Sequence, residues 1–375
     1  MPRPKSDSHE EPSRRRRAAR RSTGQSEFDL IAHFRERAAT PDARGAHGLV
    51  RGIGDDAAVF RPRPGTALLV TSDLLVEDVD FRLSDFGPSD IGHKAAAASL
   101  SDVAAMGGRP RWLLLSIGVT RELWARENFV AELFDGASSL AQGFGAHVVG
   151  GDISRTPERV VVDATVIGEA GRAVYRSGAR PGDQIFVTGT LGGAAGALRV
   201  FEHAASLKKS SRRAAERFAG DHRELASCQT RPAPRVEWGE LLGRLRLAAA
   251  MIDTSDGLSS DLAHLCRESG VGALVEAALV PVNPLLKNVG AARDDDFARS
   301  LRRDAPSLAL HGGEDFELLF TVRPRDVSRL PESLSGVAVT RVGEIREARE
   351  GVRLLRGRRA TRLRPRGFEH FRRDG

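Results

Sequence analysis

The chain has 375 residues, of which 41% are hydrophobic and 29% are charged, a composition typical of a soluble globular protein of about two domains. No run of the sequence approaches the roughly 20 apolar residues that a membrane-spanning helix needs, and the N-terminus lacks the apolar segment of a secretory signal. Two cysteines, Cys228 and Cys266, are too few for a disulfide framework or a four-cysteine zinc site. We therefore expect a cytoplasmic protein without a membrane partner.

The net charge of +7 is concentrated at the two ends of the chain. Residues 1–25 carry a net charge of +5 and residues 351–375 carry +7, which leaves −5 for the segment between them. The first segment is rich in Arg, Pro and Ser and is predicted to be a disordered, solubilising tail; weak binding of RNA or an anionic surface is the alternative. An acidic body is typical of a protein that collects divalent cations, so nucleic acid is not expected as a partner.

Strands and helices alternate along the sequence, which predicts a mixed α/β protein. In chain order, the apolar patterns predict a strand at 67–71, a helix at 91–106, a strand at 112–119, a helix at 121–144, strands at 147–149, 160–167 and 184–188, helices at 193–203, 236–245 and 258–268, and strands at 272–276 and 316–322. A boundary is predicted near 169–172, so that residues 26–169 form an N-terminal domain and residues 170–375 a C-terminal domain. The polar segment 204–228 is interpreted as a helical excursion or a mobile insertion.

A glycine-rich segment at residues 188–196 follows a predicted strand and opens a helix. It lacks the lysine of a P-loop and the spacing of a dinucleotide-binding fingerprint. Its backbone N–H groups could hold a phosphate, or its glycines could serve only the close packing of a helix on a strand. The sequence favours the packing interpretation.

Aspartates recur at the ends of predicted strands or beside glycines, and they are the strongest functional signal in the chain. They occur in the segments Gly54-Asp55-Asp56, Thr71-Ser72-Asp73, Leu100-Ser101-Asp102, Gly150-Gly151-Asp152, Ile252-Asp253-Thr254-Ser255-Asp256 and Gly312-Gly313-Glu314-Asp315. Each alone has a structural explanation, because aspartate suits turns and Asp256 or Ser255 could cap the next helix. Together they predict a site at one edge of an α/β layer, where carboxylates at strand ends gather.

Asp102 is the hardest of these residues to explain structurally, because an acidic side chain on an alanine-rich helix face is costly without a partner. Carboxylate oxygens are the ligands that Mg²⁺ prefers, and Mg²⁺ recruits substrate phosphates to complete its coordination. The histidines lack metal-ligand spacing with the cysteines, and the GxSxG elbow of a serine hydrolase is absent. The pattern therefore indicates magnesium-dependent phosphoryl transfer.

The ordered motifs resemble those of the thiamine-monophosphate kinase family, within the aminoimidazole ribonucleotide synthetase superfamily. The resemblance covers nearly the whole chain after the tail and rests on residues 52–59, 71–81, 99–107, 150–155, 187–192, 252–258 and 312–318. It implies two α/β domains per chain and a homodimer paired through the N-terminal sheets. It also implies transfer of the γ-phosphoryl group of ATP to thiamine monophosphate, the last step of thiamine diphosphate biosynthesis. Several Mg²⁺ ions are implied in a cleft that uses both domains, and a need for a monovalent cation is left open.

The same resemblance assigns roles to individual residues. The implied magnesium ligands are Asp56, Thr71, Ser72, Asp73, Asp102, Asp152, Asp253 and Asp256, with Asp55 as a neighbouring ligand. The implied ATP contacts are Gly151, Asp152, Arg176 and Ser255. The implied substrate contacts are Asp80, Glu314 and Phe368, the last as an aromatic stacking surface. Catalysis is then expected from positioning and metal electrostatics, without a covalent intermediate.

Two positions depart from the family pattern. Asp80 stands where the family usually has a histidine that faces the substrate. Gln229 stands where the family has a histidine ahead of an Arg-Pro-x-Pro-Arg motif. Neither position belongs to the implied metal ligands, so the departures bear on the choice of substrate and not on phosphoryl transfer.

Other functions remain as alternatives. Selenophosphate synthetase generally uses a cysteine or selenocysteine near its N-terminus, and the first 60 residues contain no cysteine. The hydrogenase-maturation dehydratase needs a C-terminal cysteine, whereas this sequence ends in Arg-Asp-Gly, and aminoimidazole ribonucleotide synthetase fits the motifs less well. A nucleic-acid-binding module that uses the basic ends, and a nucleotide-binding protein without turnover, are alternatives of a different class.

Overall fold

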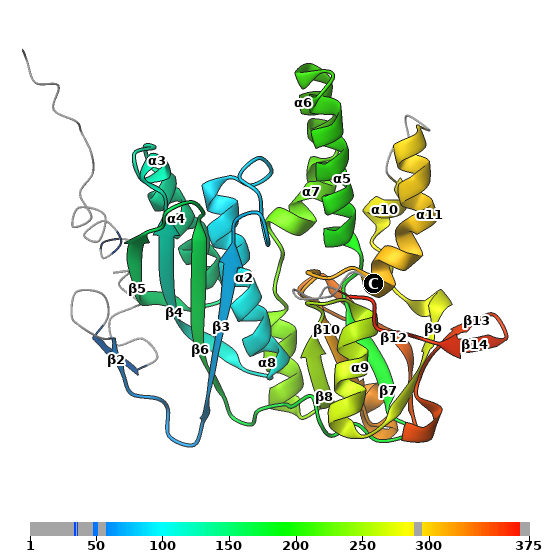
Figure 1. Ribbon diagram of the computed structural model, residues 1–375. Helices are drawn as coiled ribbons and strands as arrows, with labels where there is room; N and C mark the ends of the chain where they lie inside the picture. Colours follow the sequence, from blue (N-terminus) through cyan, green and yellow to red (C-terminus); the bar gives the residue numbers. More distant parts are fainter. Residues whose placement is uncertain (1–33, 35, 37–47, 52–57, 289–294, 368–375) are drawn as a thin grey trace, which may run out of the picture.

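The computed structural model describes residues 34, 36, 48–51, 58–288 and 295–367. Two sheets with helices packed against them lie side by side (Figure 1). This mixed α/β architecture is the one that the alternation of elements predicted. Asp55, Asp56, Phe368 and the predicted tail 1–25 lie outside the described residues. Within the described part of the chain, no helix has the length and apolar character needed to cross a membrane.

The N-terminal unit contains a four-stranded sheet. Its strands lie in the order β3 (Ala67–Val76), β6 (Val161–Ala170), β4 (Arg109–Val119) and β5 (His147–Arg155). Strand β6 is antiparallel to both of its neighbours, and β4 is parallel to β5. A separate pair joins β1 (Leu49–Arg51) to β2 (Val59–Phe60). The order of the four strands makes β3 an edge strand.

Helices α2 (Pro88–Ala105) and α4 (Phe129–Gly143) cover one face of this sheet (Figure 1). They approach closely because a glycine lies at the contact: a Cβ on Gly136 would be only 2.0 Å from the carbonyl oxygen of Ser89. The predicted helix 121–144 is wrong as a single element, since it is divided into α3 (Arg121–Trp124) and α4. Asn128 between them has a φ of 62°, a left-handed conformation that interrupts a right-handed helix.

The C-terminal unit is built on a larger, mainly antiparallel sheet. Its strands lie in the order β14 (Arg359–Arg362), β13 (Val352–Arg356), β9 (Gly272–Glu276), β12 (Val337–Arg346), β7 (Gln184–Thr188), β10 (Leu318–Val322) and β8 (Ala248–Asp253), and β11 (Ser333–Leu334) pairs with β12. Its α-helices are α5 (Gly193–Lys208), α6 (Arg212–Asp221), α7 (Arg223–Thr230), α8 (Val236–Leu245), α9 (Leu258–Ser269), α10 (Pro284–Asn288) and α11 (Asp296–His311). The polar segment 204–228 is the predicted helical excursion, and α5 and α6 project away from the sheet in Figure 1.

One hydrophobic cluster spans the two units. The largest cluster of buried side chains includes Leu100 of α2, Trp238 of α8 and Phe320 of β10. A Cβ on Gly239 of α8 would lie 2.2 Å from the carbonyl oxygen of Ala104, so the glycine lets α8 lie directly on the end of α2. Helix α2 is thereby held between the two sheets and presents side chains to both.

Two predicted strands continue further than the apolar pattern indicated. Strand β3 extends to Val76 and β5 extends to Arg155. Asp73 and Asp152 therefore lie within strands, and their placement after strand ends was wrong. Both strands lie at the edges of the sheet, where polar side chains interrupt the apolar pattern without interrupting the backbone pairing.

Candidate active site

Three aspartates from different elements meet where α2 lies between β3 and β8. They are Asp73 of β3, Asp102 of α2 and Asp253 at the end of β8, named here the aspartate cluster. Burial and then the charge of Asp102 raise the pKa of Asp73 to about 6. The same two causes raise the pKa of Asp253, and burial raises that of Asp102. The carboxylates are therefore close enough to repel one another when ionised.

Hydroxyl groups of α2 hold two of these carboxylates in place. Ser99 Oγ donates to Asp73 Oδ2 at 2.7 Å, on the side of the N-terminal sheet. Ser101 Oγ donates to Asp253 Oδ2 at 2.7 Å, on the side of the C-terminal sheet. One helix thus orients carboxylates that belong to different units, which explains why polar residues occur on its otherwise apolar surface.

The aspartate cluster fits a hard divalent cation. Among the described residues, none of its three carboxylates forms a salt bridge with a basic side chain; their hydrogen-bond donors are hydroxyls. In that part of the chain, no group of three or more His, Cys, Asp or Glu side chains is arranged so that it could hold a metal ion by itself. Mg²⁺ does not need one, because it is usually held by one or two carboxylates together with water and substrate phosphates. The cluster therefore suits a metal that is shared with a phosphorylated ligand.

A cavity of about 630 Å³ opens beside the aspartate cluster. Thr71, Asp102 and Arg176 line it together, and Thr71 donates a hydrogen bond to Asp102. The guanidinium charge of Arg176 favours the ionised carboxylates of Asp102 and Asp253. Apolar side chains of β3, α2 and β8 form other parts of the wall. A cavity with an apolar wall, a guanidinium and carboxylates is suited to a nucleotide whose phosphates meet a metal.

Two of the predicted metal ligands lie on the opposite face of the N-terminal sheet. Side chains alternate between faces along β3, so Ser72 points away from the face of Asp73, and its Oγ donates to Asp163 Oδ2 at 2.9 Å. The pairing of β5 with β4, and of β4 with β6, places Asp152 on the same face as Asp163. Gly151 permits this pairing, since a Cβ there would lie 1.9 Å from a carbonyl oxygen of β4. The structure therefore divides the predicted ligands between two faces of the sheet.

Ser255 and Asp256 lie in the loop between β8 and α9. Sequence reasoning allowed either side chain to cap α9, but the capping position is Gly257, whose N–H donates to Asp261 Oδ2 at 2.9 Å. The N–H of Glu314 donates to the carbonyl oxygen of Ser255 at 2.8 Å, which ties this loop to the segment before β10. The two predicted ligand residues are thus held beside the end of β8 without serving as the helix cap.

The glycine-rich segment is used for packing. Its N–H groups at Gly192 and Ala194 donate to the carboxylate of Asp315 at 2.6 and 3.1 Å, and burial raises the pKa of Asp315 to about 7. A Cβ on Gly192 would lie 2.7 Å from the backbone nitrogen of Ala309. The packing interpretation of this segment is confirmed, since a carboxylate of the chain itself occupies the N–H groups that a phosphate would need.

Lys94 of α2 is a functional candidate that sequence reasoning missed. Its side chain is almost fully buried, and its Nζ lies 2.7 Å from Glu314 Oε1. The same Nζ donates to the carbonyl oxygen of Asp80 at 2.7 Å and to Gln229 Oε1 at 3.3 Å. The available signal was the lysine itself, because a cation on an alanine-rich helix face needs partners.

Comparisons with known proteins place the chain in a family. Two family models match it: the N-terminal domain of AIR synthase related proteins matches residues 54–170, and the C-terminal domain matches residues 180–355. The thiamine-monophosphate kinase of Bacillus subtilis is 33% identical over 350 residues, which cover 92% of this chain and 99% of the relative. That of Escherichia coli K12 is 35% identical over 349 residues, which cover 92% and 98%. This chain belongs to the thiamine-monophosphate kinase family.

Solved structures of the family have the same fold. The crystal structure of thiamine-monophosphate kinase from Stenotrophomonas maltophilia K279a is 36% identical, with a TM-score of 0.72 over 88% of this chain and 96% of that chain. A ThiL protein complexed with AMPPCP and TMP is 29% identical, with a TM-score of 0.68 over 92% and 97%. The hydrogenase maturation protein HypE in complex with ATP, at 20% identity and a TM-score of 0.64, shows the shared fold alone. The family and the two-domain fold predicted from the motifs are confirmed.

The two departures from the thiamine-monophosphate kinase pattern meet at Lys94. Gln229 donates a hydrogen bond to Glu314 and accepts one from Lys94, so it joins the predicted substrate residue to the buried cation. The carboxylate of Asp80 accepts a hydrogen bond from the N–H of Val76 at 2.8 Å, which closes the turn after β3. Asp80 thus contributes its carbonyl oxygen to the network around Lys94, while its side chain stabilises the turn.

Proposed function

We propose that this protein phosphorylates thiamine monophosphate with ATP in a magnesium-dependent reaction that gives thiamine diphosphate and ADP. The observation that carries the proposal is the cavity that brings Thr71, Asp102 and Arg176 together beside the aspartate cluster. Membership of the thiamine-monophosphate kinase family supports the reaction type. The ThiL protein solved with AMPPCP and TMP supports the pair of substrates.

The residues of the aspartate cluster would hold the metal. Asp73, Asp102 and Asp253 supply oxygen ligands from both units, and the hydroxyls that donate to them keep their orientation. Bound magnesium would neutralise charge on the β- and γ-phosphates while the acceptor phosphate approaches. Arg176 would bind phosphate oxygens from the other side of the cavity. Because the acceptor is already an anion, no side chain is needed as a strong general base.

The network around Lys94 would shape the acceptor side of the site. Glu314 is about one-third exposed at its side chain, so it can face a ligand while Lys94 and Gln229 hold it. A carboxylate held by a buried cation has its orientation fixed before a substrate binds. We therefore assign Glu314 to substrate binding, and Lys94 and Gln229 to its positioning.

A second copy of this chain is the proposed partner of the N-terminal sheet. The face opposite α2 exposes three apolar side chains of the edge strand β3, with exposed fractions of 43% at Leu68, 68% at Val70 and 58% at Leu74. An apolar row of this kind on an edge strand is typical of a subunit interface. Ser72 and Asp152 lie on the same face, so pairing would bring the second group of predicted ligands against the partner subunit.

The reaction is tested with purified protein, ATP, Mg²⁺ and thiamine monophosphate, with EDTA and with unphosphorylated thiamine as controls. We expect thiamine diphosphate and ADP in equal amounts, no product in EDTA and none from thiamine. Formation of ADP without thiamine diphosphate would contradict the proposed acceptor. Product formation that EDTA leaves unchanged would contradict the role of the aspartate cluster.

A further inference from the structure

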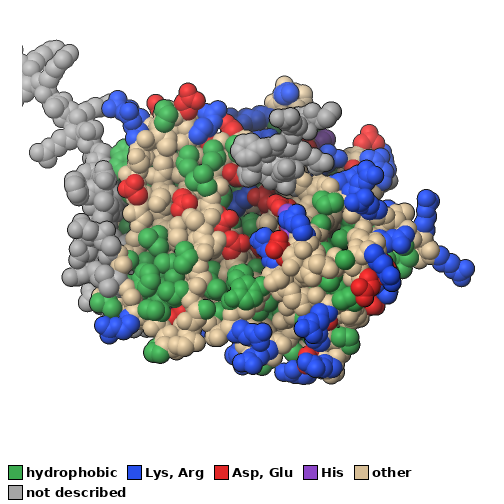
Figure 2. All heavy atoms as spheres, turned by 60° about the horizontal axis from the view of Figure 1, so that its bottom comes forward, with side chains coloured by type: hydrophobic (Ala, Val, Ile, Leu, Met, Phe, Trp, Pro, Cys, Tyr) green, Lys and Arg blue, Asp and Glu red, His purple; other side chains and the backbone are tan. Residues whose placement is uncertain are grey.

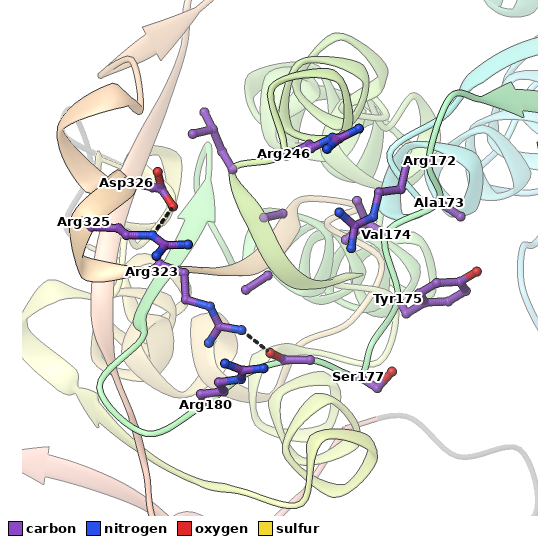
Figure 3. A pocket seen from close by; sticks show the side chains of 15 residues that line it. Arg172, Ala173, Val174, Tyr175, Ser177, Arg180, Arg246, Arg323, Arg325 and Asp326 are labelled. Atoms are coloured by element: carbon purple, nitrogen blue, oxygen red, sulfur yellow. Dashed lines mark hydrogen bonds and ion pairs between the residues drawn. The ribbon is translucent and has the colours of Figure 1, made fainter. Parts of the chain in front are cut away.

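A second cavity, of about 400 Å³, lies away from the candidate active site (Figure 3). The linker that follows β6, the turn from α8 into β8 and the start of the 3₁₀ helix η3 (Pro324–Arg329) surround it. It reaches Ala248 at the start of β8, whereas Asp253 is at the other end of that strand. Five residues at about 3.3 Å each separate the two ends by about 16 Å. The second cavity is therefore distinct from the aspartate cluster.

The lining of this cavity is strongly basic. Its charged residues are Arg172, Arg180, Arg246, Arg323, Arg325 and Asp326, with a formal charge of +4. Two of the arginines have partners in the chain: Arg323 lies 2.6 Å from Asp183, and Arg325 lies 3.6 Å from Asp326. Arg323 also donates to the carbonyl oxygen of Gly178 at 2.9 Å, which fixes its guanidinium against the linker.

The other three arginines, Arg172, Arg180 and Arg246, have charges that the chain does not balance locally. Among the described residues, none of their side chains forms a salt bridge or a hydrogen bond. In Figure 3 Arg172 and Arg246 approach the pocket from one side, and Arg180 and Arg323 from the other. In Figure 2 Lys and Arg side chains also gather on the right-hand and lower parts of the surface, whereas acidic side chains gather in a central hollow. Guanidinium groups that line one cavity and have no acidic partner of their own attract an anion with several oxygens.

We infer that this cavity, named here the arginine pocket, binds the diphosphate group of a small molecule. A diphosphate group attached to a small molecule carries up to about three negative charges near neutral pH, which match the three arginine charges that no acid of the chain balances. The volume is within the range of small-molecule pockets, roughly 300–1,000 Å³, and leaves room for a group attached to the diphosphate. The pocket is thus an anion site in addition to the one proposed for the kinase reaction.

A ligand in the arginine pocket would also affect the nucleotide cavity. Tyr175 and Ser177 line both cavities, and Arg176 lies between them in the linker. An anion held by Arg172 and Arg180 would restrain this linker at two points. The position of Arg176, and with it the affinity for nucleotide, would then depend on whether the arginine pocket is occupied.

Calorimetric titration with inorganic pyrophosphate, in EDTA and at low salt, tests the inference. EDTA removes divalent cations, so binding that needs a metal at the aspartate cluster is suppressed. We expect one site per chain and an affinity at least about tenfold lower in the Arg180→Ala/Arg246→Ala double variant, because two charge-assisted contacts are lost. The matched control is Arg213→Ala/Arg217→Ala, which removes two exposed arginines of α6 and should bind like the parent.

Thermal unfolding of both double variants shows first that each is folded. Titrations with ADP and with thiamine diphosphate then distinguish the possible sources of the group. If ADP or thiamine diphosphate binds more tightly than pyrophosphate, and the gain is lost in Arg180→Ala/Arg246→Ala, that compound is the source of the diphosphate group. Equal affinities for pyrophosphate, ADP and thiamine diphosphate show that the diphosphate alone is recognised. The inference is overturned if the parent binds no pyrophosphate at low salt, or if both double variants weaken binding equally. None of these readouts requires turnover, so their failure leaves the proposed kinase reaction untouched.

Discussion

Replacing Asp102 by asparagine should have opposite effects on the stability of the protein and on its activity. Asparagine keeps the shape of the side chain and an oxygen that can accept the hydrogen bond of Thr71, but it removes one of three neighbouring negative charges that are buried or half-buried. Asp73 and Asp253 then lose a neighbour whose charge raises their pKa values. We expect a variant that is more stable than the parent without metal and far less active with it.

The size of the stabilisation follows from Asp73, whose pKa is raised from 3.8 to about 6. At about 1.36 kcal/mol per unit, the whole shift disfavours the ionised folded state by about 3 kcal/mol. Burial is the larger cause and Asp102 the second, so relief of the repulsion contributes about 1 kcal/mol. Between about pH 4 and 6 the folded state retains a proton that the unfolded state releases, so stability falls as the pH rises. The advantage of Asp102→Asn is therefore small near pH 4 and complete above about pH 7.

Thermal unfolding in EDTA and steady-state kinetics in Mg²⁺ measure the two effects. At pH 8 the Tm should rise by about 1–2 °C, the shift that about 1 kcal/mol gives in a chain of 375 residues at roughly 2.1 cal/mol/K of unfolding entropy per residue. With saturating Mg²⁺, kcat should fall by about 100-fold or more, because an electrostatic contact to the transferred group is lost. Asp221→Asn, on the exposed surface of α6, is the matched control and should change neither quantity.

Two results would refute this reasoning. A lower Tm of Asp102→Asn than of the parent, in EDTA at pH 8, would show that the three carboxylates do not repel one another. Near-normal turnover at saturating Mg²⁺ would show that Asp102 does not hold a metal that the reaction needs.

Three other variants test the acceptor side and the interface. Lys94→Met should lower the free energy of unfolding by about 3 kcal/mol, because Glu314 loses its buried cation; a loss below about 1 kcal/mol in chemical denaturation would contradict the buried pair. Asp80→His should change the KM for thiamine monophosphate more than kcat, and an unchanged KM would mean that this turn does not affect acceptor binding. Val70→Asp combined with Leu74→Asp should convert a dimer to a monomer in sedimentation velocity, and a persistent dimer would exclude this face as the interface.

Much of the fold could be predicted from the sequence because it depends on local patterns. Strands β7 and β9 and helix α8 have the predicted bounds, since each is a short apolar or amphipathic run between residues that end it. The break at Asn128 was not predicted, because the apolar spacing continues through it while its backbone takes a left-handed conformation. The ends of β3 and β5 were missed for a related reason: backbone pairing continues where the apolar pattern stops.

The candidate site shows the same division between local and tertiary information. The residue types, carboxylates beside glycines and a charged residue on an alanine-rich helix, indicated metal and phosphate chemistry from the sequence alone. Only the tertiary structure decided that Asp152 of β5 shares the sheet face of Ser72 and lies opposite Asp73, because the relative faces of residues in different strands depend on the register of their pairing. Lys94 became a candidate only when α2 was placed between the two units, since its partner Glu314 is more than 200 residues away in the chain. The sequence by itself thus indicated the kind of chemistry to expect, and long-range packing decided which of the candidate residues lie together.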